Sequence, residues 1–199
     1  MQSALFSSDT NLLPRDGKVV LFENALNVDF DTLRDEIEWR HEKIRLFGKR
    51  VLQPRLTAWY GDPGTDYVYS GLKNTPKAWT PTLQAIKHKI EEYSKTRFNS
   101  VLLNLYRDGQ DSMGWHQDNE PELGDNPVIA SLSFGASRKF QMRHKFDKTL
   151  AKLDFELHSG SLLIMSGQTQ QYWQHQLAKT KKAVGQRINL TFRTIHHKE

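Results

Sequence analysis

The stretch Arg187-Ile188-Asn189-Leu190-Thr191-Phe192-Arg193 alternates polar and apolar side chains at every position. Successive side chains of a β-strand point to opposite faces, so this stretch predicts a strand with one apolar face and one polar face that carries two guanidinium groups. Asn104 and Tyr106 repeat the pattern between Leu103 and Leu105. Such a polar face either lines the interior of a barrel or jelly roll, or it is the solvated face of an antiparallel sheet.

Short strands separated by glycine-containing turns fill the second half of the chain. After a first strand at residues 18–22, we expect strands at 101–106, 128–134, 139–144, 154–157, 161–165 and 187–194. Helices are expected earlier, at 31–40 and from Thr80-Pro81 onwards. Helices followed by a run of strands predict an α+β fold, namely a double-stranded β-helix (jelly-roll) core with N-terminal helices packed on the sheet.

Length and composition indicate one domain, because 199 residues of which 37% are hydrophobic can bury one substantial core. We interpret residues 1–17 as an N-terminal arm and residues 18–199 as a single domain, with residues 100–195 forming the jelly-roll core. The chain has no cysteine, which excludes thiolate metal sites and iron–sulfur clusters. Any metal must therefore be held by nitrogen and oxygen ligands.

The net charge of +5 is compatible with a polyanionic partner, and equally with a solvated basic surface. No apolar run approaches the roughly 20 residues that span a bilayer, and residues 1–15 lack the features of a secretory signal. We therefore expect no membrane partner. The chain has no long basic cluster resembling a nuclear signal, and we expect a monomer located in the cytoplasm of a bacterium, or in the nucleus if the source is eukaryotic.

The segment His116-Gln117-Asp118 predicts two ligands of a metal site. Residues two apart on an extended segment point to the same face, so His116 and Asp118 can reach one ion together. Two imidazoles and one carboxylate can occupy one face of an octahedral Fe(II) and leave open positions for exchangeable ligands. The site therefore needs one further histidine.

Three histidines that follow this pair could complete the site: His144, His158 and His175. His144 lies in a basic segment and is expected to face solvent. His158 and His175 stand at opposite ends of the apolar strand at 162–165, which crosses about 15 to 20 Å. Only His175 leads by a short connection into the strand with the two arginines, so we favour His175.

Several ordered motifs carry a family resemblance: Asn104-Leu-Tyr-Arg-Asp-Gly109, Trp115-His-Gln-Asp-Asn-Glu120, Ile129-Ala-Ser-Leu-Ser-Phe-Gly135, Gly160-Ser-Leu-Leu-Ile-Met165, His175 and the stretch at 187–193. Together they resemble the AlkB family of Fe(II)- and 2-oxoglutarate-dependent dioxygenases, especially its nucleic-acid dealkylating members. The likeness covers most of residues 46–195. It implies three cofactors or cosubstrates, Fe(II), 2-oxoglutarate and O2, and makes three residues the catalytic iron ligands, His116, Asp118 and His175.

The resemblance also implies a binding site for 2-oxoglutarate formed by six side chains: Asn104, Tyr106, Arg187, Asn189, Thr191 and Arg193. The distal carboxylate of 2-oxoglutarate needs a permanently charged, bidentate partner, for which Arg193 is the expected residue. Arg187 is then expected to steady the groups around the iron. Similar proteins oxidise methyl groups on base nitrogens, with release of formaldehyde, succinate and CO2. The implied function is direct-reversal repair of lesions such as 1-methyladenine and 3-methylcytosine in DNA, or in RNA.

Residues 46–71 are expected to recognise the nucleotide. A dealkylase must flip its target base out of a duplex, and three residues occupy the family's base-pocket segment, Tyr67, Tyr69 and Ser70. Ordinary aromatic packing is the alternative for the tyrosines. Glu120 follows the metal pair closely, where a carboxylate would favour a cationic methylated base, or else it is an exposed loop acid.

Phe47 lies before Lys49 and Arg50 in a segment that matches the hairpin with which duplex-acting relatives wedge between bases. This predicts activity on double-stranded DNA, unless Phe47 is a core residue. The following segment, at 54–61, also resembles relatives that prefer single strands. The sequence therefore leaves the choice between single-stranded and double-stranded substrates open.

Two other functions compete with DNA or RNA dealkylation. The first is a 2-oxoglutarate oxygenase that acts on a protein or a small molecule, against which the base-pocket tyrosines and the basic balance argue. The second is a non-catalytic nucleic-acid binding module with a structural metal. The presence of all three expected metal ligands and both arginines argues against it.

Overall fold

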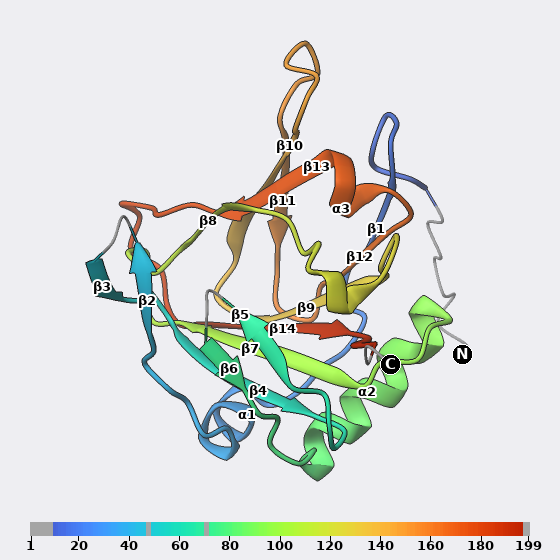
Figure 1. Ribbon diagram of the computed structural model, residues 1–199. Coiled ribbons are helices and arrows are strands. Elements are labelled where there is room, and N and C mark those ends of the chain that lie inside the picture. The colour runs from blue at the N-terminus through green and yellow to red at the C-terminus, as the bar shows by residue number, and fades with distance from the viewer. Residues whose placement is uncertain (1–9, 47–48, 70–71, 197–199) are drawn as a thin grey trace, which may run out of the picture.

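The computed structural model describes residues 10–46, 49–69 and 72–196, and its main feature is a pair of antiparallel sheets (Figure 1). The larger sheet has the strand order β1 (Lys18–Phe22), β12 (Leu162–Ser166), β9 (Ile129–Gly135), β14 (Arg187–Arg193), β7 (Ser100–Tyr106) and β4 (Leu56–Gly61). The smaller sheet has the order β11 (Leu153–Leu157), β10 (Arg138–His144), β13 (Trp173–Leu177) and β8 (Met113–His116). This arrangement confirms the predicted jelly-roll core.

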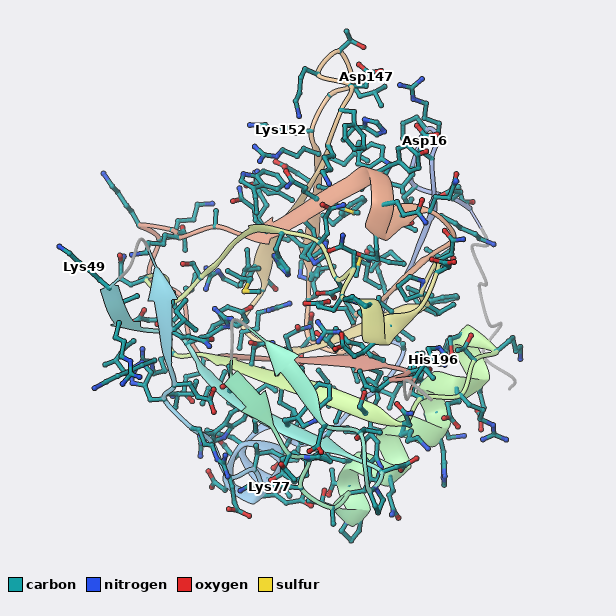
Figure 2. All side chains as sticks on the ribbon, in the orientation of Figure 1. Asp16, Lys49, Lys77, Asp147, Lys152 and His196 are labelled. Carbon is teal, nitrogen blue, oxygen red and sulfur yellow. The ribbon has the colours of Figure 1, made fainter. Side chains whose placement is uncertain are left out.

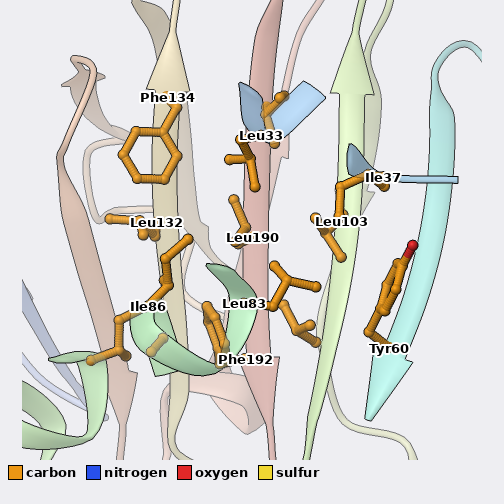
Figure 3. Packing of buried hydrophobic residues seen from close by; sticks show 14 of the residues in the cluster. Leu33, Ile37, Tyr60, Leu83, Ile86, Leu103, Leu132, Phe134, Leu190 and Phe192 are labelled. Atoms are coloured by element: carbon orange, nitrogen blue, oxygen red, sulfur yellow. The ribbon is translucent and has the colours of Figure 1, made fainter. Parts of the chain in front are cut away.

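The alternation along β14 gives the larger sheet two different faces. Leu190 and Phe192 point to the apolar face, where they pack in one core cluster with Leu83 and Ile86 of α2 (Pro81–Ser94) (Figure 3). The polar residues of β14 point to the opposite face, toward the smaller sheet. All seven residues of β14 are buried, so the alternative of a solvated sheet face is wrong.

Two helices cover the apolar face, as the sequence predicts. The longer helix, α2, begins at Pro81, and the hydroxyl of its N-cap residue Thr80 accepts a hydrogen bond from the Leu83 amide at 3.2 Å. The helix α1 (Phe30–Glu36) ends earlier than predicted. The reason is that the backbone of Arg40 pairs in both directions with Thr57 of β4, at 2.8 and 2.9 Å.

The remaining elements are short. Two of the strands pair as a hairpin, β2 (Lys43–Leu46) with β3 (Lys49–Leu52), and two more form a small sheet, β5 (Tyr67–Tyr69) with β6 (Leu72–Asn74). A 3-10 turn, η1 (Pro121–Leu123), follows β8, and a single helical turn, α3 (Thr169–Tyr172), precedes β13. Among the helices of the described ranges, none has both the length and the apolarity needed to cross a bilayer.

Glu91 connects the end of α2 to the segment that leads into β7. Its side chain is 5% exposed, accepts a hydrogen bond from the Phe98 amide at 2.8 Å and forms an ion pair with Arg97 at 2.7 Å. Burial raises the pKa of Glu91, but these hydrogen bonds and the charge of Lys87 outweigh it and hold the pKa below its usual value of 4.5. The carboxylate is therefore more stable in the native state than in the unfolded chain.

We predict that Glu91→Gln lowers the free energy of unfolding at pH 7 by about 1.5 to 3 kcal/mol, because it removes charge-assisted hydrogen bonds from a buried position. The native pKa lies below the unfolded value of 4.5, so this stabilisation is present above that pH and is lost as the pH falls below it. Urea denaturation of both proteins at pH 7 and at about pH 3 measures the difference. A difference of equal size at the two pH values would contradict this account.

Candidate active site

His116, Asp118 and His175 come together between the two sheets. The pairing of β13 with β8 sets His175 opposite His116, and the centroids of the two rings are 4.2 Å apart. Asp118 follows the end of β8, with its Oδ1 atom 3.9 Å from His116 Nε2. One nitrogen or oxygen atom from each of the three residues lies within 4.8 Å of the other two. This spacing suits three ligands of one metal ion.

The other two candidate histidines lie elsewhere. His144, the last residue of β10, is buried, lies 3.2 Å from Asp16 through its Nε2 atom, and its ring meets that of Trp173 edge-on. The expectation that His144 faces solvent is wrong, because the alternation along β10 turns it inward. His158 Nδ1 lies 2.8 Å from the hydroxyl of Ser137. The only described histidines that gather with a carboxylate in this way are thus His116 and His175.

The three side chains have the protonation states that a cation requires. Burial lowers the pKa of His175 to about 3, so its imidazole is neutral at pH 7. Burial raises the pKa of Asp118, but the nearby charges of Arg193, His175 and His116 outweigh it and lower the pKa to about 2. His175 Nδ1 is buried without a hydrogen-bond partner, and His116 Nδ1 lies 2.8 Å from the Gly114 carbonyl, which leaves His116 Nε2 for an ion. These donors fit Fe(II).

Arg187 forms the other end of the same cavity. Its guanidinium donates a hydrogen bond to the Ser133 hydroxyl at 2.8 Å and lies 5.3 Å from the ring centroid of Tyr106. Its Nε atom is buried without a partner, and no carboxylate in the described ranges forms an ion pair with it. Burial lowers the pKa of Arg187 to about 10, so it stays charged at pH 7. A buried, unneutralised cation is costly, and the carboxylate of a ligand would offset that cost.

Every side chain expected to hold 2-oxoglutarate lines the cavity that the metal triad also lines: Asn104, Tyr106, Arg187, Asn189, Thr191 and Arg193. The Asn189 amide donates to the Ser131 hydroxyl at 2.8 Å, and the Thr191 hydroxyl donates to Asn189 Oδ1 at 3.0 Å. Arg193 forms an ion pair with Asp118 at 2.9 Å, next to the triad. From the sequence, Arg193 was expected to bind the distal carboxylate of 2-oxoglutarate and Arg187 to lie near the iron. The geometry favours the opposite roles, with Arg187 as the partner of the carboxylate and Arg193 beside the metal.

Two buried residues of the site were absent from the sequence analysis. Arg55 is 3% exposed, and its Nε atom donates to Asn104 Oδ1 at 2.7 Å. Gln170 is 1% exposed, and its side chain accepts a hydrogen bond from the Asp118 amide at 3.0 Å. Arg55 could have been found as a polar residue that directly precedes the buried strand β4. No pattern in the sequence points to Gln170.

The residues expected to bind the substrate either do not line the cavity or have side chains that the structure does not describe. Glu120 is half-buried and is not among the residues that line the cavity, although its Oε2 atom is buried without a hydrogen-bond partner. Tyr67 and Tyr69 lie on β5, whose side chains are not described. Phe47 and Ser70 lie outside the described residues. The substrate roles of these five residues stay predictions.

We predict that Mn(II), used as a redox-stable substitute for Fe(II), raises the melting temperature of the protein and that Asp118→Ala removes this effect. A ligand at 100 times its dissociation constant stabilises the native state by about 2.7 kcal/mol. Melting curves with Mn(II) and with a chelator measure the shift. Asp154→Ala, at an exposed carboxylate on β11, is the matched control and should keep it. An undiminished shift in Asp118→Ala would mean that the ion binds elsewhere.

Comparisons with known proteins agree with the fold and identify an oxygenase family. Residues 18–193 match the family model described as the 2OG-Fe(II) oxygenase superfamily. The chain is 49% identical over 152 residues to the alpha-ketoglutarate-dependent dioxygenase alkB homolog 3 of Mus musculus, covering 72% of this chain and 52% of that protein. It is 41% identical over 175 residues to the DNA oxidative demethylase ALKBH2 of Mus musculus, covering 83% of this chain and 73% of that protein.

The solved structure of OsALKBH1 has the same fold, with a TM-score of 0.62 at 17% identity, over 88% of this chain and 96% of that chain. The chain spans about half the length of the Mus musculus alkB homolog 3, 52% by coverage. The family match nevertheless extends over most of the chain described here. This chain therefore belongs to the AlkB family of Fe(II)- and 2-oxoglutarate-dependent dioxygenases.

Proposed function

We propose that this protein is an Fe(II)- and 2-oxoglutarate-dependent dioxygenase that dealkylates N-alkylated bases, of the 1-methyladenine and 3-methylcytosine type, in DNA or RNA. The observation that carries the proposal is a single cavity lined at one end by the His116, Asp118 and His175 triad and at the other by the unneutralised guanidinium of Arg187. The names of the relatives, a DNA oxidative demethylase and alpha-ketoglutarate-dependent dioxygenases, support the same chemistry.

The metal end has three ligands and one positioning arginine. In this proposal His116, Asp118 and His175 hold the iron, and Arg193 orients the Asp118 carboxylate through their 2.9 Å ion pair. When bound, the iron and 2-oxoglutarate activate O2, so that an alkyl carbon on the base is hydroxylated and lost as an aldehyde, with succinate and CO2 as coproducts. Nearby charges, that of Arg193 first, keep the Asp118 carboxylate ionised against the effect of burial, whereas burial keeps both imidazoles neutral, as metal ligation requires.

The cosubstrate end is built around Arg187. Its fork of N–H groups can bind the distal carboxylate of 2-oxoglutarate through two parallel hydrogen bonds, and Ser133 holds the guanidinium in place. Asn104 faces the same cavity, and Arg55 fixes the orientation of its amide by donating to Oδ1 at 2.7 Å. Tyr106 covers the guanidinium of Arg187 with its ring at 5.3 Å. Asn189 and Thr191 complete the polar wall.

The substrate side of the proposal keeps the residues named from the sequence. Tyr67, Tyr69, Ser70 and Glu120 contact the flipped base, and Phe47 wedges into a duplex. Lys49, at the start of β3, projects away from the β2–β3 hairpin and suits a phosphate (Figure 2). We further propose that the protein is a monomer and that it acts in a bacterial cytoplasm, or in the nucleus if its source is eukaryotic.

We predict that the wild-type protein removes methyl groups from oligonucleotides that contain 1-methyladenine or 3-methylcytosine, in the presence of Fe(II), ascorbate and 2-oxoglutarate, and that Asp118→Ala does not. Mass spectrometry of single-stranded and double-stranded DNA and RNA substrates measures the product, and Asp154→Ala serves as the active control. Succinate formation without demethylation would favour an oxygenase with another substrate. Oligonucleotide binding without any succinate would favour a non-catalytic module.

We predict that Arg187→Gln weakens 2-oxoglutarate binding by about 30-fold or more, because loss of one partner of a buried, hydrogen-bonded charge pair costs about 2 kcal/mol at least. The affinity of the Arg187→Gln variant for Mn(II) should change little. Arg193→Gln should instead weaken Mn(II) binding, since Arg193 contacts Asp118. Calorimetric titration of each ligand into each variant measures both effects. If Arg193→Gln weakened 2-oxoglutarate binding and Arg187→Gln weakened Mn(II) binding, Arg193 would be the carboxylate partner, as the sequence suggested.

A further inference from the structure

Asp118 lies beyond the point where the pairing of β8 with β13 ends. In the antiparallel register His175 faces His116, so a continued ladder would set Asp118 opposite Trp173. The structure has no such pair, and the chain after His116 leaves the strand. Strand pairing therefore fixes two of the three metal ligands and leaves the backbone of the third to another support.

Gln170 provides that support from the single helical turn α3. Its Oε1 atom accepts a hydrogen bond from the Asp118 amide at 3.0 Å, and its Nε2 atom lies 3.5 Å from the sulfur of Met165, which lines the cavity. Gln117 strengthens the same connection, since its side-chain amide donates to the carbonyl oxygens of Gln170 at 2.7 Å and Gln171 at 3.1 Å. The side chain of Gln117 and the amide of Asp118 are thus held to α3 by three hydrogen bonds.

The turn α3 is itself firmly attached to the larger sheet. The Thr169 hydroxyl accepts from the Lys18 amide at 3.0 Å and donates to the Ser166 carbonyl at 2.6 Å. Gly17 approaches so closely that an added Cβ would lie 2.4 Å from Thr169 Oγ1, and its φ of +143° also favours glycine. The turn continues directly into β13, which carries His175. One anchored turn therefore controls the position of Asp118 relative to His175.

We propose that Gln170 is a positioning residue of the metal centre, which sets the backbone of Asp118 so that its carboxylate points at the ion. The inference rests on the proposed function in taking the triad as the metal site. Asp118 is then held from two directions, with Gln170 on its backbone and Arg193 on its carboxylate. Partners that orient metal ligands typically change metal affinity by about 10- to 100-fold when they are mutated.

The test compares Gln170→Met with the matched control Gln171→Met. Methionine has nearly the length of glutamine but offers no comparable acceptor, so the Asp118 amide loses its partner. Gln171 lies in the same turn, is exposed, and its side chain contacts Asn126 rather than Asp118. Titration of metal-free protein with Mn(II), followed by electron paramagnetic resonance, should give a dissociation constant raised about 10-fold or more in Gln170→Met. In Gln171→Met the constant should equal that of the wild type.

A second variant covers the case in which Gln170→Met does not fold. Gln170→Asn keeps a polar amide but retracts the acceptor by one methylene, and it should weaken Mn(II) binding in the same direction. Wild-type affinity in a folded Gln170 variant, with Asp118→Ala failing to bind, would overturn the role of Gln170 and leave the metal site intact. Absence of Mn(II) binding in the wild type itself would overturn both this inference and the proposed function.

Discussion

The burial of two guanidinium groups on one face of β14 is the constraint on which the rest of the structure depends. Arg187 and Arg193 are 2% and 4% exposed. They stand six positions apart on the strand, a distance of about 20 Å. A buried charge must be neutralised, hydrogen-bonded or both. Arg193 is neutralised by Asp118, while Arg187 has the Ser133 hydroxyl and the Tyr106 ring but no carboxylate among the described residues. The cavity between them is therefore polar at both ends, for different reasons.

The two sheets contribute different parts of this cavity. The larger sheet supplies the arginines and the amide side chains, which lie on β14 and β7. The apolar side chains of the same two strands point to the opposite face and form the core under the helices. The smaller sheet supplies both histidines through the pairing of β8 with β13. Packing of the two sheets is therefore what brings the metal ligands within reach of the anion partner. A change that displaced one sheet against the other would separate the two halves of the site even if every side chain were kept.

The parts of the fold that repeat with period two could be predicted from the sequence. The alternation along β14 and β7 separated a polar face from an apolar face, since each position of a strand has only two possible directions, but it left open whether the polar face is buried. The end of α1 could not be predicted, because it is set by the pairing of Arg40 with β4, far away in the sequence. The strand β13 was not predicted either, because its glutamines and single histidine have no strong strand preference of their own.

The site was predictable in its residue types and less so in its contacts. The His116 and Asp118 pair follows from spacing, and His175 follows from chain order. The roles of Arg187 and Arg193 depend instead on which end of β14 faces Asp118, and that is decided by long-range strand pairing. His144 shows the same limit, since a basic segment suggested solvent exposure, whereas the alternation along β10 buries it.

The backbone pairs that flank β4 have a consequence for the behaviour of the protein at high concentration. β4 is the last strand of the larger sheet, and unpaired strand edges are templates for joining sheets of different molecules. Here Arg40 pairs with Thr57 and Lys77 pairs with Tyr60, so part of this edge is already taken by the same chain. Lys77 also forms an ion pair with Glu38, so the covering segment is held in place by a side chain of the same chain. The edge of the sheet is in this way protected against aggregation.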